Sequence, residues 1–242
     1  MFLIGDENRG QRLTPWVNYT LLALNVLIFF YQLSLSETEL VRFVVRWGVI
    51  PDEVSGGEDL YTLISAMFVH GGWLHLIGNM LFLWVFGDNV EDTMGHIKYL
   101  LFYLLCGFAA SAGQVLFNTG SATPMVGASG AISGVLAAYL VMFPTGRIKT
   151  LILLGWIPFI FLVPAWVHIG FWIVLQFING IAALDVRTAE TGGGVAYFAH
   201  IGGFVAGLAL VWLFRDRDAY ERQKAAREGH HAWQRMRWGE QQ

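Results

Sequence analysis

The feature that most constrains this chain is a series of apolar segments, each close to 20 residues long, with little polar sequence between them. At about 1.5 Å of rise per residue, a helix of that length crosses the roughly 30 Å hydrocarbon core of a bilayer. Of the 242 residues, 55% are hydrophobic and 14% are charged, whereas soluble domains carry about 25% charged residues. The sequence therefore predicts a membrane-embedded chain.

Six membrane spans are predicted, and all are expected to be helices. A segment inside the bilayer must satisfy its own backbone groups, and the alternating pattern of a membrane barrel is missing. The predicted fold class is all-α, a polytopic bundle of six transmembrane helices in residues 17–214, preceded by an N-terminal segment (1–16) and followed by a charged tail (215–242). The spans are expected at Val17–Leu35, Gly71–Phe86, Ile97–Phe117, Gly127–Pro144, Ala165–Ala183 and Ala196–Phe214.

Two connecting segments are too long or too apolar for simple turns. Ser36–Leu63 is expected to be a partly embedded loop on the outer side of the membrane. Thr150–Val163 is apolar but is broken by Gly155 and Pro158. A seventh span there would reverse the charge asymmetry of the loops, so this segment is expected at the cytoplasmic interface.

Lysine and arginine residues indicate the orientation of the predicted bundle. Six spans put both termini on one side, and that side carries twelve of the 15 basic residues. Because cytoplasmic loops are enriched in Lys and Arg, both termini are expected to be cytoplasmic. The chain is predicted to be a multi-pass membrane protein, and its location is predicted to be a bacterial inner membrane.

The first polar site in the apolar sequence is Gly127-Ala128-Ser129-Gly130, at the start of the fourth span. Ser129 falls in the first helical turn, where backbone N–H groups lack partners and the helix dipole is positive. Acyl transfer needs such a position beside its nucleophile, because the tetrahedral intermediate carries an oxyanion. Alternatively, Gly130 and Gly134 form a stripe of small residues for helix packing, in which a serine is ordinary.

His200, Gly203 and Gly207 share one face of the sixth span, given their spacings of three and seven residues. The glycines permit close approach of another helix, so His200 should point into that contact. A histidine there can accept the proton of a serine nucleophile and return it to a leaving amine. The structural alternative is a buried histidine that is satisfied by a backbone carbonyl.

His75 and Asn79 lie four residues apart on one face of the second span. Both donate hydrogen bonds without carrying charge, which suits an oxyanion hole, although polar contacts between helices would use the same residues. His70 lies about 140° from His75 around a helix and is assigned a structural role in the loop. Glu91, after this span, is expected to cap the following helix or pair with a nearby base.

The order and spacing of these residues resembles the rhomboid family of intramembrane serine proteases, over essentially the whole membrane region. The matching motifs are His70-x4-His75-x3-Asn79, Glu91-x3-Gly95, Gly127-Ala128-Ser129-Gly130 and Ala199-His200-x2-Gly203-x3-Gly207. The resemblance implies a rhomboid-like fold and a serine-type endopeptidase that cuts peptide bonds in or next to the transmembrane segments of membrane-protein substrates. The implied partners are these substrates and the lipid bilayer.

The resemblance also implies roles for single residues. Ser129 and His200 would form a catalytic dyad without an acidic member, in agreement with the absence of Asp and Glu from the fourth and sixth spans. His75, Asn79 and the Ser129 backbone N–H would form the oxyanion hole. Structural residues near the site would be Gly127, Gly130, Gly203 and Gly207. No metal or cofactor is implied.

Two positions depart from the family pattern. Many bacterial members carry Trp-Arg in the first outer loop, where this chain has Tyr61 and Thr62, so this loop is expected to sit differently in the bilayer. Some members place a tyrosine one turn after the nucleophile, beneath the histidine. This chain has Ser133 there, so another group must orient His200.

Other classes of protein fit the sequence less well. An inactive relative that binds membrane clients would have lost Ser129 or His200, and both are present. A transporter would pair charges inside the membrane, whereas the acidic residues lie at span edges. A haem or metal protein would need its histidines close together, whereas the five histidines in the membrane region are expected to be scattered over both membrane faces. The net charge of −3 indicates no nucleic-acid partner, and the single Cys106 excludes an intramolecular disulfide.

Overall fold

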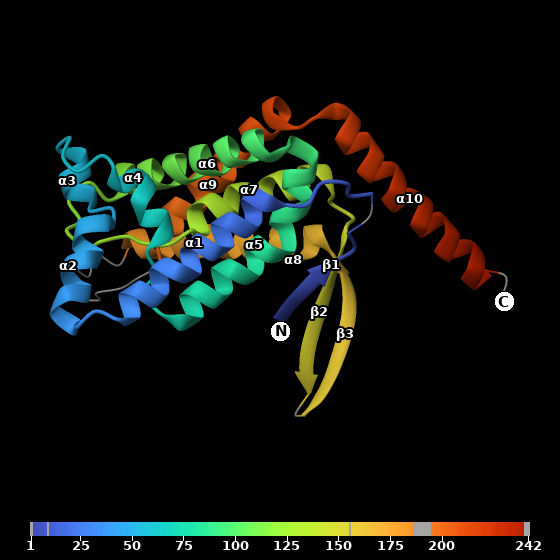
Figure 1. Cartoon of the computed structure of the whole chain (residues 1–242), viewed down its shortest axis with the longest axis horizontal. Helices are drawn as coiled ribbons and strands as arrows, with labels where there is room; N and C mark the ends of the chain where they lie inside the picture. The colour runs from blue at the N-terminus through green and yellow to red at the C-terminus, as the bar shows by residue number, and fades with distance from the viewer. Residues whose placement is uncertain (1, 9, 155, 186–194, 240–242) are drawn as a thin grey trace.

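The computed structural model describes residues 2–8, 10–154, 156–185 and 195–239. The long helices run side by side in a bundle, as Figure 1 shows. Short helices lie at one end of this bundle, and the strands and the C-terminal helix lie at the other (Figure 1). The apolar core runs through the bundle and includes large buried side chains such as Tyr99, Tyr103 and Phe86.

A helix occupies each of the six predicted spans in the described part of the chain. These helices are α1 (Trp16–Leu33), α5 (Trp73–Met94), α6 (His96–Phe117), α7 (Ser129–Met142), α8 (Ala165–Asp185) and α9 (Tyr197–Phe214). The largest difference from prediction is α5, which continues eight residues beyond Phe86. It ends where Gly95 adopts a φ of 79°, a left-handed conformation that favours glycine.

Six membrane-crossing helices are not confirmed. By length and hydropathy, four described helices can cross a bilayer, namely α1, α6, α8 and α9. A fifth crossing results if α5 is joined to the short helices over Thr62–Phe68, from which it is bent by 95°. The 14 residues of α7 span about 21 Å, less than a hydrocarbon core of about 30 Å. This short helix is nevertheless central, since it contacts α5, α6, α8 and α9.

The connection between α1 and α5 is largely helical. It consists of α2 (Glu37–Trp47), α3 (Pro51–Ser55), α4 (Thr62–Ser65) and the 3-10 helix η1 (Ala66–Phe68). A capping box between Ser36 and Glu39 starts α2, and no residue of α2 is buried. Its exposed apolar residues include Val41 and Val45. Insertion of this segment into a membrane stays a prediction.

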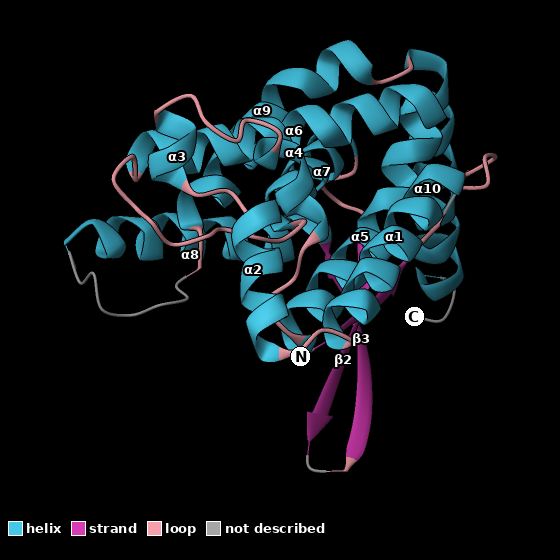
Figure 2. Ribbon diagram, turned by 60° about the vertical axis from the view of Figure 1, so that its left-hand side comes forward, coloured by secondary structure: helices cyan, strands magenta, loops and turns pink. Residues whose placement is uncertain are grey.

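The all-α prediction is wrong at one end of the bundle. Strands β1 (Phe2–Asp6), β2 (Arg147–Leu154) and β3 (Ile157–Pro164) form an antiparallel sheet in the order β1-β2-β3. The β2–β3 hairpin protrudes from the helices (Figure 2). It contains the predicted interfacial segment. Two runs rich in β-branched residues, separated by Gly155-Trp156, favour a hairpin, and Pro158 and Pro164 disfavour a helix.

The charged tail forms helix α10 (Arg217–Gly239), whose first half packs against the N-terminal segment and the end of α5. Arg222 donates to the Gly10 carbonyl at 3.0 Å and to the Asp92 carboxylate at 2.7 Å. Arg227 lies 3.5 Å from the carboxylate of Asp6. The first and last described segments therefore meet at one end of the molecule.

Candidate active site

Close contact between α7 and α9 places Ser129 near His200. A Cβ atom on Gly203 would overlap the carbonyl oxygen of Gly130, and one on Gly207 would overlap the carbonyl oxygen of Gly134. Only glycines at 203 and 207 allow the two backbones to come this close. The three glycines Gly130, Gly203 and Gly207, predicted to be structural, thus lie in one helix contact.

Ser129 is the first residue of α7, and His200 lies in the first turn of α9. The Oγ atom of Ser129 is 2.7 Å from Nε2 of His200. His200 is buried and Ser129 is half-buried. A hydroxyl at this distance can donate to the imidazole nitrogen, which is the contact that general-base activation requires.

The other ring nitrogen of His200 contacts α8. Its Nδ1 lies 2.8 Å from Oε1 of Gln176. Because an amide oxygen only accepts, Nδ1 carries the proton, and the neutral ring accepts at Nε2 from Ser129. The Gln176 amide nitrogen donates to the Trp172 carbonyl at 3.3 Å. The Trp172 ring also packs against His200, with centroids 5.5 Å apart.

The chain turns at Gly127 immediately before α7. Its φ of 124° is rarely adopted by residues with a side chain, and its N–H donates to the Ala66 carbonyl at 2.8 Å. A Cβ atom at this position would lie 2.6 Å from Nε2 of His75 and 3.6 Å from Nδ2 of Asn79. Glycine at 127 therefore leaves room for two side chains of α5 beside the start of α7.

His75 and Asn79 are both oriented by local hydrogen bonds. Nδ1 of His75 accepts from the Gly71 N–H at 3.4 Å, which places the ring proton on Nε2, facing Gly127. Asn79 donates one amide hydrogen to Nε2 of His70 at 3.0 Å and retains a second. The structure thus brings two neutral donors beside the N-terminus of α7. Among the described contacts, no hydrogen bond joins either donor directly to Ser129 or His200.

Comparison with known proteins identifies the family. The family model described as the Rhomboid domain matches residues 57–217, which include every residue of the candidate site. This chain belongs to the rhomboid family. Members of the family are known as intramembrane serine proteases.

Several curated rhomboid proteins are similar to this chain. Rhomboid protein 1, mitochondrial, of Saccharomyces cerevisiae is 28% identical over 85% of this chain and 55% of its own length. RHOMBOID-like protein 6, mitochondrial, of Arabidopsis thaliana is 32% identical over 70% of this chain and 49% of its own. Rhomboid protease GluP of Bacillus subtilis is 29% identical over 81% of this chain and 35% of its own.

This chain matches only part of each of these relatives. This rhomboid chain spans about half the length, or less, of these three relatives. Their names point to mitochondria in yeast and a plant, and one relative is bacterial. Together with the apolar helices they indicate an integral membrane protein. They do not support the prediction of a bacterial inner membrane.

The positions that depart from the rhomboid pattern have local partners. Ser133 donates to the Ser129 carbonyl at 2.6 Å, so its hydroxyl is bonded within α7. Tyr61 donates to the Arg46 carbonyl at 2.8 Å, and Thr62 donates to the Asp59 carbonyl at 2.7 Å. The tyrosine thus connects the start of α4 to the end of α2.

Glu91 caps a different helix from the one predicted. Its two carboxylate oxygens accept from the N–H groups of Val17 at 3.0 Å and Asn18 at 2.7 Å, in the first turn of α1. It also contacts Nδ1 of His96, the predicted pairing with a nearby base. Glu91 is fully buried, so this rhomboid motif residue joins the end of α5 to the start of α1.

Two contributors to the site, Gln176 and Trp172 of α8, were absent from the sequence prediction, and both contact His200. His70, which the sequence assigned only a structural role in the loop, also orients Asn79. His70 is itself fixed through its backbone, which exchanges two hydrogen bonds with the Gln32 amide. Two features of the sequence pointed to these roles: Gln176 is an isolated glutamine in an apolar span, and His70 has a fixed position in the motif with His75 and Asn79.

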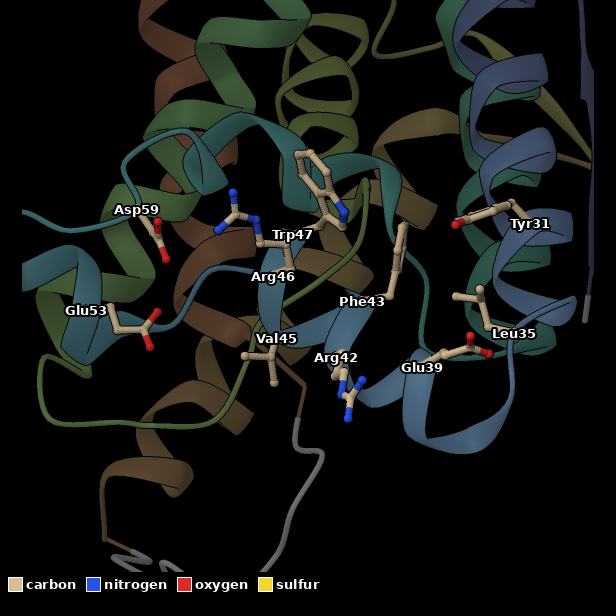
Figure 3. A pocket seen from close by; sticks show the side chains of 10 residues that line it. All are labelled: Tyr31, Leu35, Glu39, Arg42, Phe43, Val45, Arg46, Trp47, Glu53 and Asp59. Atoms are coloured by element: carbon tan, nitrogen blue, oxygen red, sulfur yellow. The ribbon is translucent and has the colours of Figure 1, made fainter.

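A pocket of about 620 Å³ lies away from these residues, beside α2 (Figure 3). It is lined by charged and aromatic side chains of α2 and its neighbours and by none of the candidate site residues. The lining residues are Tyr31, Leu35, Glu39, Arg42, Phe43, Val45, Arg46, Trp47, Glu53 and Asp59.

Proposed function

We propose that this chain is an intramembrane serine endopeptidase that hydrolyses peptide bonds in or next to transmembrane segments of other proteins. Ser129 is the nucleophile and His200 is its general base. The observation that carries the proposal is the 2.7 Å contact between Ser129 Oγ and His200 Nε2 in the bundle. Membership of the rhomboid family supports the same reaction class.

The reaction proceeds in two steps. Ser129 Oγ attacks the scissile carbonyl carbon while Nε2 of His200 takes the hydroxyl proton. The C–N bond then breaks, and His200 returns the proton to the leaving amine, which leaves an acyl ester on Ser129. A water molecule, activated by the same nitrogen, hydrolyses this ester and regenerates the hydroxyl. No step requires a metal or cofactor.

The oxyanion of each tetrahedral intermediate is held by the backbone N–H of Ser129 and the side chains of His75 and Asn79. The N-terminus of α7 supplies unpaired N–H groups and the positive end of a helix dipole. His75 Nε2–H and the second amide hydrogen of Asn79 lie beside Gly127, two residues before the nucleophile. Fixed neutral donors stabilise negative charge that appears only in the transition state.

The proposed membrane arrangement follows the distribution of charge. The chain is multi-pass, its substrates are membrane proteins, and both ends of the chain are cytoplasmic. The ends of the described chain meet through Arg222 and Arg227, on the side that is rich in Lys and Arg and therefore expected to face the cytoplasm.

The direct test is cleavage of a model transmembrane substrate by purified protein in lipid. Ser129→Ala and His200→Ala should each lower kcat by at least about 10³-fold, because removal of a nucleophile or base leaves only the residual stabilisation of the oxyanion site. Full activity in either variant would refute the dyad. Binding of the substrate without cleavage by the unmodified protein would favour an inactive family member.

A further inference from the structure

We infer that Gln176 of α8 is a positioning residue that holds His200 in the tautomer and orientation needed for base catalysis. This inference rests on the proposed function, because it concerns the base of the Ser129–His200 pair. It addresses the departure at Ser133, which leaves the role of orienting His200 to another part of the chain.

The geometry consists of three consecutive hydrogen bonds. The Trp172 carbonyl accepts from the Gln176 amide nitrogen at 3.3 Å. The Gln176 amide oxygen accepts from Nδ1 of His200 at 2.8 Å, and Nε2 of His200 accepts from Ser129 at 2.7 Å. Each bond sets the direction of the next, since an amide nitrogen only donates and an amide oxygen only accepts. The proton of neutral His200 is thereby assigned to Nδ1.

The chemical identity of Gln176 suits its surroundings. The side chain is buried in a helix that can cross the membrane, where a carboxylate would be costly. A glutamine supplies the same acceptor geometry to Nδ1 without a charge. Trp172 lies one turn before Gln176 on α8 and packs against the imidazole. Gln176 thus contacts the ring at Nδ1, and Trp172 packs beside it.

Gln176 belongs to α8, a helix that the rest of the bundle covers only partly. Among the described residues, four helices are long and apolar enough to cross a membrane without a second segment, and α8 has the smallest buried share of these four, 22%, against 28% to 39% for the others. The residue that orients the base therefore comes from the helix with the least cover from the bundle. A displacement of α8 would separate Gln176 from His200 and release the tautomer, whereas α7 and α9 would stay in contact through their glycines.

The test compares Gln176→Leu with Gln176→Glu, and uses Asn179→Leu as the matched control. Leucine removes the acceptor, whereas glutamate keeps one. Asn179 is an exposed amide on the same helix, so its replacement tests the loss of an amide from α8 away from the site. The measurements are kcat, KM and the pH profile of cleavage of a model transmembrane substrate, together with the thermal unfolding midpoint.

For Gln176→Leu we expect kcat to fall by roughly 10- to 100-fold with KM within about twofold, because the general-base contribution depends on the correct tautomer. Gln176→Glu should be more active than Gln176→Leu, and the acidic limb of its pH profile should move to higher pH, since a carboxylate favours the protonated imidazole that cannot act as base. Asn179→Leu should match the unmodified protein.

Equal kcat in Gln176→Leu and Asn179→Leu would overturn the inference, as would lower activity in Gln176→Glu than in Gln176→Leu when each variant is assayed at its own pH optimum. If Gln176→Leu does not fold, Gln176→Met, which keeps the length of the side chain but lacks the amide oxygen, replaces it in the same comparison with Asn179→Leu: a lower kcat supports the role, and an equal kcat overturns it. Ser129→Ala is assayed in parallel. Cleavage that survives in Ser129→Ala refutes the proposed dyad itself, which distinguishes that failure from a failure confined to Gln176.

Discussion

At the scale of single residues, the end of the bundle near the chain termini contains buried polar side chains with defined partners. Asp6 of β1 accepts hydrogen bonds from Tyr139 at 2.7 Å and Asn89 at 2.9 Å, and Arg227 lies 3.5 Å away. Burial, with a smaller contribution from the neighbouring Asp88, raises the pKa of Asp6 to about 7. The folded chain therefore favours the protonated carboxyl.

This raised pKa predicts how stability changes with pH. Between pH 4 and pH 7 the folded chain holds a proton on Asp6 that the unfolded chain, with a pKa near 3.8, has released. The stabilisation is complete below pH 4 and is lost as the pH rises through 7, with a slope of up to about 1.4 kcal/mol per pH unit. Asp6→Asn should flatten this part of the curve of unfolding free energy against pH. An identical slope in both proteins would contradict the assignment.

Ser129, His200, His75 and Asn79 are predictable from the sequence because a polar side chain in an apolar span requires an explanation. The same rule applies to Gln176, but the sequence does not reveal which residue it faces. That partner depends on how α8 packs against α9, a relation between distant segments. Contacts of this kind, such as that of His70 with Asn79, become visible only in the folded chain.

At the scale of elements, the helices follow from long apolar runs, whereas the sheet does not. Residues 150–163 are apolar without a period, and pairing of β2 with β1 joins segments more than 140 residues apart. The length of α7 was also overestimated, because the turn at Gly127 lies outside the helix. Local patterns therefore predicted where the helices lie but not which of them cross the membrane.

The contact between α7 and α9 makes a prediction for Gly203. In Gly203→Ala the new methyl group would overlap the Gly130 carbonyl oxygen, so α9 must shift. We expect a loss of about 1–3 kcal/mol in unfolding free energy, typical of overpacking, and a loss of cleavage activity larger than the loss of folded protein.

Gly78→Ala is the matched control for this substitution. Gly78 is a helical glycine in α5 with open space around its Cβ position. This change should leave activity intact and should not lower the thermal unfolding midpoint. Equal effects of the two alanine substitutions on activity would show that close backbone approach is not needed.

At the scale of the whole molecule, the N-terminal segment, the end of α5 and α10 form one end, and α2, α3 and α4 lie at the other (Figure 1). The candidate site lies where the N-termini of α7 and α9 meet. The single native cysteine, Cys106, is fully buried and should react little with polar reagents.

This arrangement predicts the reactivity of introduced cysteines. Glu58, between α3 and α4, and Glu228, in α10, are both exposed acidic residues. The helices next to them lie at opposite ends of the bundle (Figure 1). In intact cells a membrane-impermeant maleimide should label Glu58→Cys and should label Glu228→Cys only after permeabilisation, because the basic side faces the cytoplasm. The reverse pattern would invert the proposed orientation.

The central claim is that His200 activates Ser129 for attack on an acyl carbon. A fluorophosphonate probe followed by peptide mass spectrometry tests this claim without knowledge of the natural substrate. We predict one adduct on the peptide that contains Ser129, its absence in Ser129→Ala, and labelling at least about tenfold slower in His200→Ala. An adduct that persists in Ser129→Ala, or labelling of Ser129 at an unchanged rate without His200, would contradict the account.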